Sequence, residues 1–136
     1  MTEAVAVPVF VRHVNPRKQG DAGMGIAIGW FACAGYTVCL PLTDSQPYDL
    51  IVDDGEHGLQ RVSVKSTTQL KAGYYIAGLR TQGGNKSQFT IRHFDKSVVD
   101  LLFVACSNGD RYLIPTAELK VLSAVHLGPK YQRFRI

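Results

Sequence analysis

The chain has 136 residues, of which 46% are hydrophobic and 19% charged, and its formal net charge is +4. This size and globular composition indicate a single domain over residues 1–136 that is large enough to bury a core. A helical membrane span is excluded, because no stretch approaches the roughly 20 apolar residues that it needs, and the apolar N-terminus lacks the basic segment of a signal peptide.

The N-terminal part predicts a short strand followed by a helix. Alternating valines indicate a strand within residues 1–15, and Pro8 restricts it to the edge of a sheet. Residues 20–34 are small and apolar, which predicts a mostly buried helix with Asp21 as its cap. Gly35 is expected to end this helix.

Residues 48–65 predict a β-hairpin with two alternating arms and an Asp-Gly turn. If the hairpin is centred on Glu56, Asp49 lies opposite Ser63, with Cβ atoms roughly 4.5–5.5 Å apart, and Lys65 is the diagonal neighbour at about 7–8 Å. A carboxylate, a hydroxyl and a lysine then share one face, which suits a metal ion beside a phosphate. On local pattern alone, the alternative of a charged face turned to water is favoured.

The remaining elements are mostly strands. Further strands are predicted over residues 36–40, 74–79, 88–93, 98–106 and 111–114. The run over 98–106 is continuously apolar, which favours a central buried strand. A short helix is predicted over residues 115–119, with Thr116 as a cap. One helix followed by many strands indicates an α+β domain with a mixed, largely antiparallel sheet.

The three cysteines are Cys33, Cys39 and Cys106, an odd number without the spacing of a metal site. They are typical of reduced, buried cysteines, and a disulfide is the less favoured alternative. We therefore expect an intracellular, cytoplasmic protein.

The charges are unevenly distributed. Five of the 11 acidic residues fall between positions 44 and 56, a window without Lys or Arg. An acidic spot within a basic surface is typical of a metal site that acts on a polyanion. The alternative is a solvated loop, which is the better interpretation for Asp54 and Glu56 in the turn.

The order of these segments resembles the PD-(D/E)XK nuclease superfamily. The resemblance rests on a helix that opens with Gly-x-x-Gly, followed by Gly35-Tyr36-x-Val38, Pro41-Leu42, residues 48–53 and residues 61–65. Within the superfamily, the chain is most similar to homing endonucleases encoded in group I introns. The likeness is strong over about residues 18–70 and looser beyond. It implies a restriction-endonuclease-like core in which an N-terminal helix packs on the sheet.

The resemblance also implies roles for single residues. Asp49 matches the metal-binding aspartate, and Lys65 matches the lysine that orients the attacking water or stabilises the phosphorane. Ser63 stands where most members carry Asp or Glu and this subgroup often carries Gln, and Met24 stands where many carry a helix glutamate. The expected catalytic set is Asp49, Ser63 and Lys65, with Asp49 and Ser63 holding Mg²⁺ or, alternatively, Mn²⁺.

These departures leave few negative ligands, so other carboxylates are candidates to assist the metal. Asp53 shares the strand face of Asp49, and Asp44 lies in the preceding loop. Asp21 is a poorer candidate, because capping the helix is the more ordinary role for it.

The expected partner is double-stranded DNA, and a small domain that reads a duplex site would act as a homodimer or a higher homo-oligomer. The candidate DNA-binding residues are Lys71, Arg80, Lys86, Arg92, Arg133 and Arg135.

The sequence therefore predicts an Mg²⁺-dependent endodeoxyribonuclease similar to homing endonucleases. A DNA-binding protein of the same fold with impaired catalysis and a Holliday-junction resolvase stay open as alternatives. A small-molecule enzyme has little support, because the four histidines are far apart and no nucleophile elbow, phosphate-binding loop or zinc spacing is present.

Overall fold

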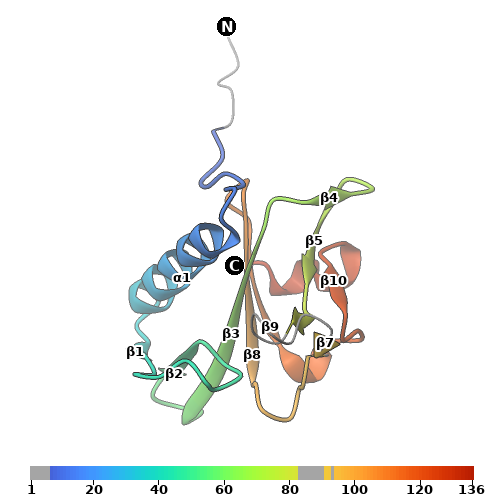
Figure 1. Ribbon diagram of the computed structural model, residues 1–136. Helices are drawn as coiled ribbons and strands as arrows, with labels where there is room; N and C mark the ends of the chain where they lie inside the picture. The colour runs from blue at the N-terminus through green and yellow to red at the C-terminus, as the bar shows by residue number, and fades with distance from the viewer. Residues whose placement is uncertain (1–6, 83–90, 93) are drawn as a thin grey trace, which may run out of the picture.

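The computed structural model describes residues 7–82, 91–92 and 94–136. In this part of the chain a helix, α1 (Pro16–Cys33), covers one face of a five-stranded sheet, and a second layer of short strands and turns covers the other face (Figure 1). No helix within the described ranges is long and apolar enough to cross a membrane.

The central sheet has the strand order β1-β2-β3-β8-β9, in which only β3 and β8 run parallel to each other. Its strands are β1 (Thr37–Cys39), β2 (Leu50–Asp53), β3 (Leu59–Thr67), β8 (Leu101–Cys106) and β9 (Arg111–Pro115). The predicted α+β class with a mixed, largely antiparallel sheet is confirmed.

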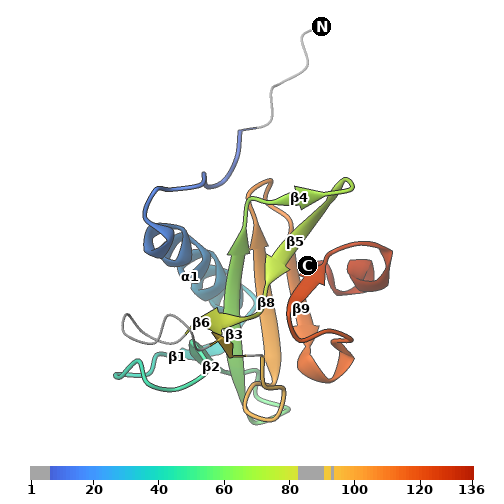
Figure 2. The ribbon, with the colours of Figure 1, turned by 45° about the vertical axis from the view of Figure 1, so that its right-hand side comes forward.

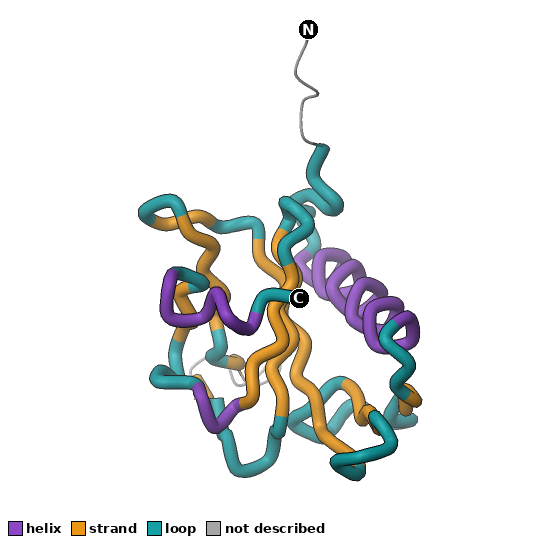
Figure 3. Tube along the Cα trace, turned by 180° about the vertical axis from the view of Figure 1, so that it is seen from behind, coloured by secondary structure: helices purple, strands orange, loops and turns teal. Residues whose placement is uncertain are grey.

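The second layer contains two small sheets and two 3₁₀ helices. Its elements are β4 (Leu70–Lys71), β5 (Tyr74–Gly78), β6 (Thr81–Gln82), β7 (Ile91–Arg92), η1 (Thr116–Glu118), β10 (Ala124–His126) and η2 (Pro129–Phe134). Strand β5 pairs with both β4 and β10, and β6 pairs with β7. Figure 3 shows this layer from behind, on the side of the sheet away from α1.

Helix α1 begins four residues before the predicted start. Asn15 is the N-cap and accepts the backbone N–H of Arg17, and Pro16 occupies the first turn. Asp21 is therefore an exposed residue inside the helix and not its cap. Gly35 follows the helix with a φ of +91°, which a glycine adopts without strain.

The helix is buried along one stripe, not over most of its surface as predicted. Gly23, Ala27 and Phe31 are its buried residues, spaced four apart. A Cβ atom on Gly23 would lie 3.0 Å from the Cβ of Ser66, so this glycine permits a close approach of α1 to β3. The helix therefore packs tightly against the central sheet, with half-buried residues such as Met24 and Ile28 beside the stripe, and leaves the opposite face to solvent.

Strand β8 divides the core into two clusters. Leu102 and Val104 pack with the second layer, whereas Phe103 and Ala105 pack with α1. All six residues of β8 are buried, as its apolar run predicted. Because both faces of the sheet are covered, the alternative of a solvent-facing polar face on β3 is wrong near the site.

Three further local predictions fail in the described chain. No strand forms within residues 7–15; the first six residues lie outside the described ranges. Thr116 lies inside η1, and its hydroxyl donates to the carbonyl of Val99 instead of capping a helix. Cys33 and Cys39 are exposed, and only Cys106 is buried, which raises the pKa of its thiol to about 12.

Candidate active site

The site begins where the β2–β3 pairing ends. Asp53 pairs with Leu59 and Leu50 pairs with Val62, so the hairpin is centred on Glu56 as predicted. Asp49 is the first residue beyond the last pair. The two strands separate at this point, and the edge of β3 that faced β2 becomes free while β8 continues to pair along the other edge.

Asp49 ties the separating strands together through its own backbone and side chain. Its N–H donates to the carbonyl of Val62 at 2.8 Å, and its Oδ2 accepts the N–H of Val64 at 2.7 Å. The Asp49 carboxylate thus accepts the N–H of Val64, which the backbone of β2 would have accepted if β2 had continued along this edge of β3. Oδ2 is fixed by this bond, which orients the second oxygen of Asp49 for another partner.

A cleft of about 640 Å³ opens at this separation, and Asp49, Ser63 and Lys65 all line it. Ser63 and Lys65 alternate with Val64, so they project from the same face of β3. The facing wall belongs to the second layer and includes Leu79, which follows β5. Figure 1 shows β5 on the side of β3 opposite α1, and Figure 2 shows β6 in front of β3. The three residues of the expected catalytic set therefore lie in one cleft.

The cleft changes the electrostatics of Lys65. Burial lowers the pKa of the Lys65 ammonium, and the Asp49 carboxylate opposes this shift. Ser63 is only 4% exposed. Lys65 is therefore a partly desolvated cation close to a carboxylate, unlike a lysine on a solvated strand.

A profile of the PD-(D/E)XK endonuclease family matches residues 14–134. This chain belongs to the PD-(D/E)XK endonuclease family. The match spans α1, the hairpin, the central sheet and the second layer, and it confirms the superfamily that the sequence indicated.

The endonuclease is also similar to a solved structure, that of a bacterial homing endonuclease, I-Ssp6803I. The two chains are 25% identical with a TM-score of 0.66, and the similarity covers 82% of this chain and 76% of that one. This likeness confirms the predicted fold, with an N-terminal helix packed on a mixed sheet. No curated protein matches the sequence.

The PD-(D/E)XK endonuclease departs from its family's carboxylate pattern in the cleft. Among the residues that the structure describes, no group of three or more His, Cys, Asp or Glu side chains is placed to hold a metal ion. Asp49 and the Ser63 hydroxyl offer one carboxylate and one neutral oxygen. This set fits Mg²⁺, which keeps several waters and binds through one or two carboxylates plus substrate phosphate.

The other carboxylates considered as metal ligands do not line the cleft of the endonuclease. Asp53 accepts the N–H of Gly55 at 2.8 Å and belongs to the hairpin turn. Asp44 is exposed in its loop, and Asp21 is exposed on α1, which covers the opposite face of the sheet. Met24 packs against the core beneath α1. None of these side chains completes the site.

The acidic cluster mostly stabilises the hairpin turn. The Asp54 carboxylate accepts the N–H groups of His57 and Glu56 and contacts the His57 ring. These bonds lower the pKa of Asp54 to about 2 and raise the pKa of His57. The solvated-turn interpretation of Asp54 and Glu56 is consistent with this geometry.

Sequence reasoning missed three polar residues of the cleft, Ser45, Gln46 and Asp95. Asp95 accepts the N–H and the hydroxyl of Ser97, which lowers its pKa and keeps it ionised. The local Asp-x-Ser pattern indicates a turn. No sequence signal places Asp95 near Asp49, because the two belong to distant segments that meet only in the folded chain.

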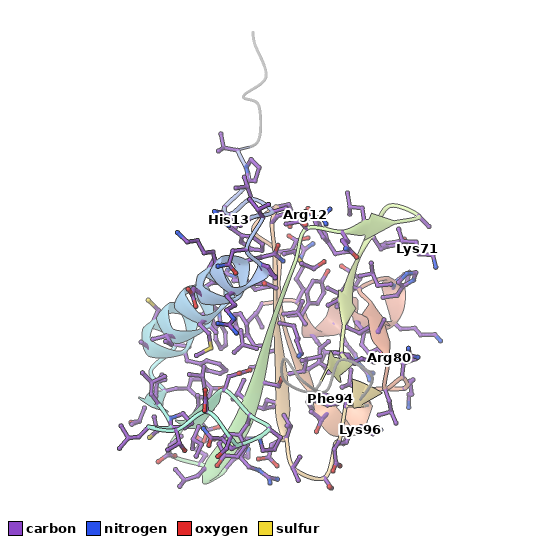
Figure 4. All side chains as sticks on the ribbon, in the orientation of Figure 1. Arg12, His13, Lys71, Arg80, Phe94 and Lys96 are labelled. Carbon is purple, nitrogen blue, oxygen red and sulfur yellow. The ribbon has the colours of Figure 1, made fainter. Side chains whose placement is uncertain are left out.

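The predicted DNA-binding residues of the endonuclease are dispersed. Lys71 lies on β4 and Arg80 follows β5, both on the second layer (Figure 4). Arg133 pairs with Glu118 at 3.0 Å, and Arg135 is 4.0 Å from an Asp110 oxygen. Lys86 lies outside the described residues, as does the side chain of Arg92. None of the four described side chains lines the Asp49 cleft.

Proposed function

We propose that this chain is a divalent-metal-dependent DNA endonuclease, similar to homing endonucleases, that hydrolyses phosphodiester bonds in the Asp49–Lys65 cleft. The observation that carries the proposal is the meeting of Asp49, Ser63 and Lys65 in one cleft at the β2–β3 separation. A carboxylate attracts a divalent cation, and a desolvated lysine attracts a phosphate. The two groups can therefore act on the same phosphodiester.

Lys65 supplies positive charge to the scissile phosphate as negative charge develops in the transition state. It projects from the long strand β3, which pairs with β8 up to Thr67, so its backbone is held rigidly. Its partial burial strengthens electrostatic attraction to a phosphate compared with a solvated lysine. The same ammonium can hold the attacking water in line with the phosphate.

Asp49 and Ser63 would hold the metal, with Mg²⁺ favoured and Mn²⁺ as an alternative. When bound, the ion would polarise the phosphate and make its water more acidic. The hydrogen bond from Val64 fixes the Asp49 carboxylate in place. With one carboxylate in this pair, we expect weak metal binding without DNA, because the substrate phosphate contributes a ligand.

Double-stranded DNA is the proposed substrate. The family match supports a nuclease, and the likeness to a bacterial homing endonuclease supports DNA as the target. The net charge of +4 favours a polyanionic partner. Exposed cations such as Lys71 and Arg80 would position the duplex through its phosphates.

The test is nicking of supercoiled plasmid with Mg²⁺ or Mn²⁺ by the wild type, Asp49→Asn and Lys65→Met. We expect metal-dependent nicking by the wild type and a loss of at least about 10²-fold in each variant. DNA affinity should change little in Lys65→Met. Asp21→Asn and Lys18→Met, on the exposed surface of α1, are matched controls that should cleave normally. Full cleavage by Lys65→Met would contradict the assignment.

A DNA-binding protein with impaired catalysis is the second candidate. It is favoured by Ser63 in place of a carboxylate and by the lack of a three-ligand acidic group in the described chain. The same assay separates the two candidates. Wild-type protein that shifts DNA in a gel but nicks no plasmid with either metal would support the binding-only alternative.

A further inference from the structure

A second cleft, of about 410 Å³, lies at the C-terminal end of β3. It is lined by Arg12 and His13 from the N-terminal segment, by Gln19 from α1, and by Thr68 and Gln69 after β3. Figure 4 shows Arg12 and His13 at the end of β3 that is close to β4. No acidic residue lines this cleft. Its polar groups and its cation therefore suit an anion.

The N-terminal segment is fixed in this position by the core and the sheet. The Phe10 side chain is 8% exposed and packs in the cluster beneath α1. The N–H of Val9 donates to the carbonyl of Ser107 at 2.8 Å, and Ser107 in turn donates its N–H to Thr67 at the end of β3. Arg12 follows Phe10 by two residues, so its backbone is anchored beside this strand end.

Hydrogen bonds also orient the polar groups of the cleft. His13 Nδ1 accepts the N–H of Asn15 at 3.0 Å, so a neutral His13 ring carries its proton on Nε2, where it can donate to a ligand. Gln19 Nε2 donates to the carbonyl and the hydroxyl oxygen of Ser66 at 3.3 and 3.4 Å, which joins α1 to β3. The cleft thus combines a guanidinium, an imidazole donor and a side-chain framework held by two elements.

This cleft and the Asp49 cleft lie along the same strand. Beyond Val62, β8 pairs along one edge of β3, whereas β2 has left the other edge. On that free edge Asp49 bonds to Val64, and two residues further Gln19 bonds to Ser66. At 3.3 Å per residue, Lys65 and Thr68 are about 10 Å apart along the strand. One strand of a duplex rises about 3.4 Å along its axis per phosphate, and neighbouring phosphates are further apart than this rise because the backbone winds around the axis. The two clefts are therefore at most about three phosphates apart.

We propose that the cleft of Arg12 and His13 binds a phosphodiester of the cleaved DNA strand, within about three nucleotides of the scissile phosphate. The inference rests on the proposed function and extends it to a backbone-binding site. Arg12 would provide the charge-assisted contact, with His13 and Gln69 as further hydrogen-bond partners. Such a contact would fix the register of the strand in the active site without reading bases.

The test measures binding of a fluorescein-labelled linear duplex of mixed sequence by anisotropy, without metal, over a series of salt concentrations. Loss of one phosphate contact reduces the magnitude of the negative slope of log association constant against log salt concentration by about 0.9. We expect this decrease in Arg12→Ala and a largely restored slope in Arg12→Lys. Arg17→Ala is the matched control, because Arg17 is exposed nearby but does not line the cleft.

Three outcomes would overturn the inference. An unchanged slope in Arg12→Ala, with a wild type that binds DNA and nicks plasmid, would reject this cleft and leave the proposed function intact. An equal decrease in Arg17→Ala would indicate diffuse surface charge and not a contact in the cleft. A wild type that neither binds nor cleaves DNA would reject both the inference and the proposed function.

Discussion

The Lys65 ammonium is half-buried, and its burial affects the free energy of unfolding. Its folded-state pKa lies below the ordinary value of 10.5, mainly because of burial. Between the two pKa values the unfolded chain binds more protons, so stability rises with pH in this window. Below the window both states are protonated, and the buried charge lowers stability. The residue that we propose for catalysis therefore weakens the fold at neutral pH.

We accordingly predict that Lys65→Met raises the free energy of unfolding at pH 7, by about 1 kcal/mol, while it abolishes cleavage. The reason is the removal of a desolvated charge from the cleft. Urea denaturation followed by circular dichroism measures the change. Lys18→Met on exposed α1 should stay within about 0.5 kcal/mol of the wild type. A destabilised Lys65→Met would contradict the argument.

Ser63 is the second residue of the cleft whose replacement we expect to have a defined effect, in this case on metal binding. Its hydroxyl stands where the family carries a carboxylate, so Ser63→Asp should add a negative ligand beside Asp49. We predict that half-maximal cleavage then needs about tenfold less Mg²⁺, which corresponds to about 1.4 kcal/mol of metal binding. Ser63→Asn has the same shape without the charge and should give no such gain. Mn²⁺ binding followed by electron paramagnetic resonance provides a readout independent of cleavage.

Among the elements, β3 has the central role, because it pairs with β2 at one end and with β8 along most of its length. Arg61 and Asp100 form a clamp, a set of hydrogen bonds between the two residues, that fixes the start of the parallel pairing of β3 with β8. The Asp100 carboxylate accepts from the Arg61 backbone at 2.7 Å and from its guanidinium at 3.0 and 3.1 Å, and the Asp100 N–H donates back to the Arg61 carbonyl. The clamp aligns the strand that carries Ser63 and Lys65.

We predict that Asp100→Asn destabilises the protein at neutral pH and that the difference from wild type shrinks in acid. The Arg61 side chain is the main cause that lowers the pKa of Asp100 below 3.8. The contribution is therefore present above pH 3.8 and is lost as the pH falls through the folded-state value. Thermal unfolding at several pH values measures it.

The control is Glu118→Gln, which breaks the more exposed pair with Arg133. We expect a smaller loss there, because exposed ion pairs contribute little. An equal loss in both variants would show that the Asp100 clamp has no special role in aligning β3 and β8.

At the scale of the whole molecule, α1 and the second layer enclose the central sheet. The described chain has one Asp49 cleft, at the point where β2 separates from β3. In the proposed function, one such cleft would hydrolyse one strand at a time. We predict that the nuclease cuts both strands of a duplex as a homodimer or a higher homo-oligomer, with one cleft for each strand. Sedimentation equilibrium with and without DNA measures the mass. A monomer under both conditions would contradict this prediction.

The sequence predicted those parts of the site that depend on neighbouring residues. The alternation of the two arms and the Asp-Gly turn predicted the register of the hairpin. This register is confirmed from the Leu50–Val62 pair to the Asp53–Leu59 pair. The apolar run of β8 predicted a strand buried on both faces, which is also confirmed. Period-two patterns and turn residues act within one hairpin or one strand, so they can be read without the rest of the chain.

The helix start shows where local signals compete. Asp21 and Asn15 are both good caps, and Pro16 after Asn15 is the stronger signal. The small and apolar composition of residues 20–34 and Asp21 as a cap predicted the later start. In the folded chain, Gly23 lies inside α1 and permits its close approach to Ser66.

The sequence by itself determined the hairpin, the identity of the three clustered polar residues and the family pattern to which they belong. Only the tertiary structure decided that the second layer covers the polar face of β3, that burial lowers the pKa of Lys65, and that Asp95 and Arg12 line clefts. The physical reason is that local pairing follows from side-chain periodicity, whereas desolvation and cleft shape depend on segments far apart in the chain.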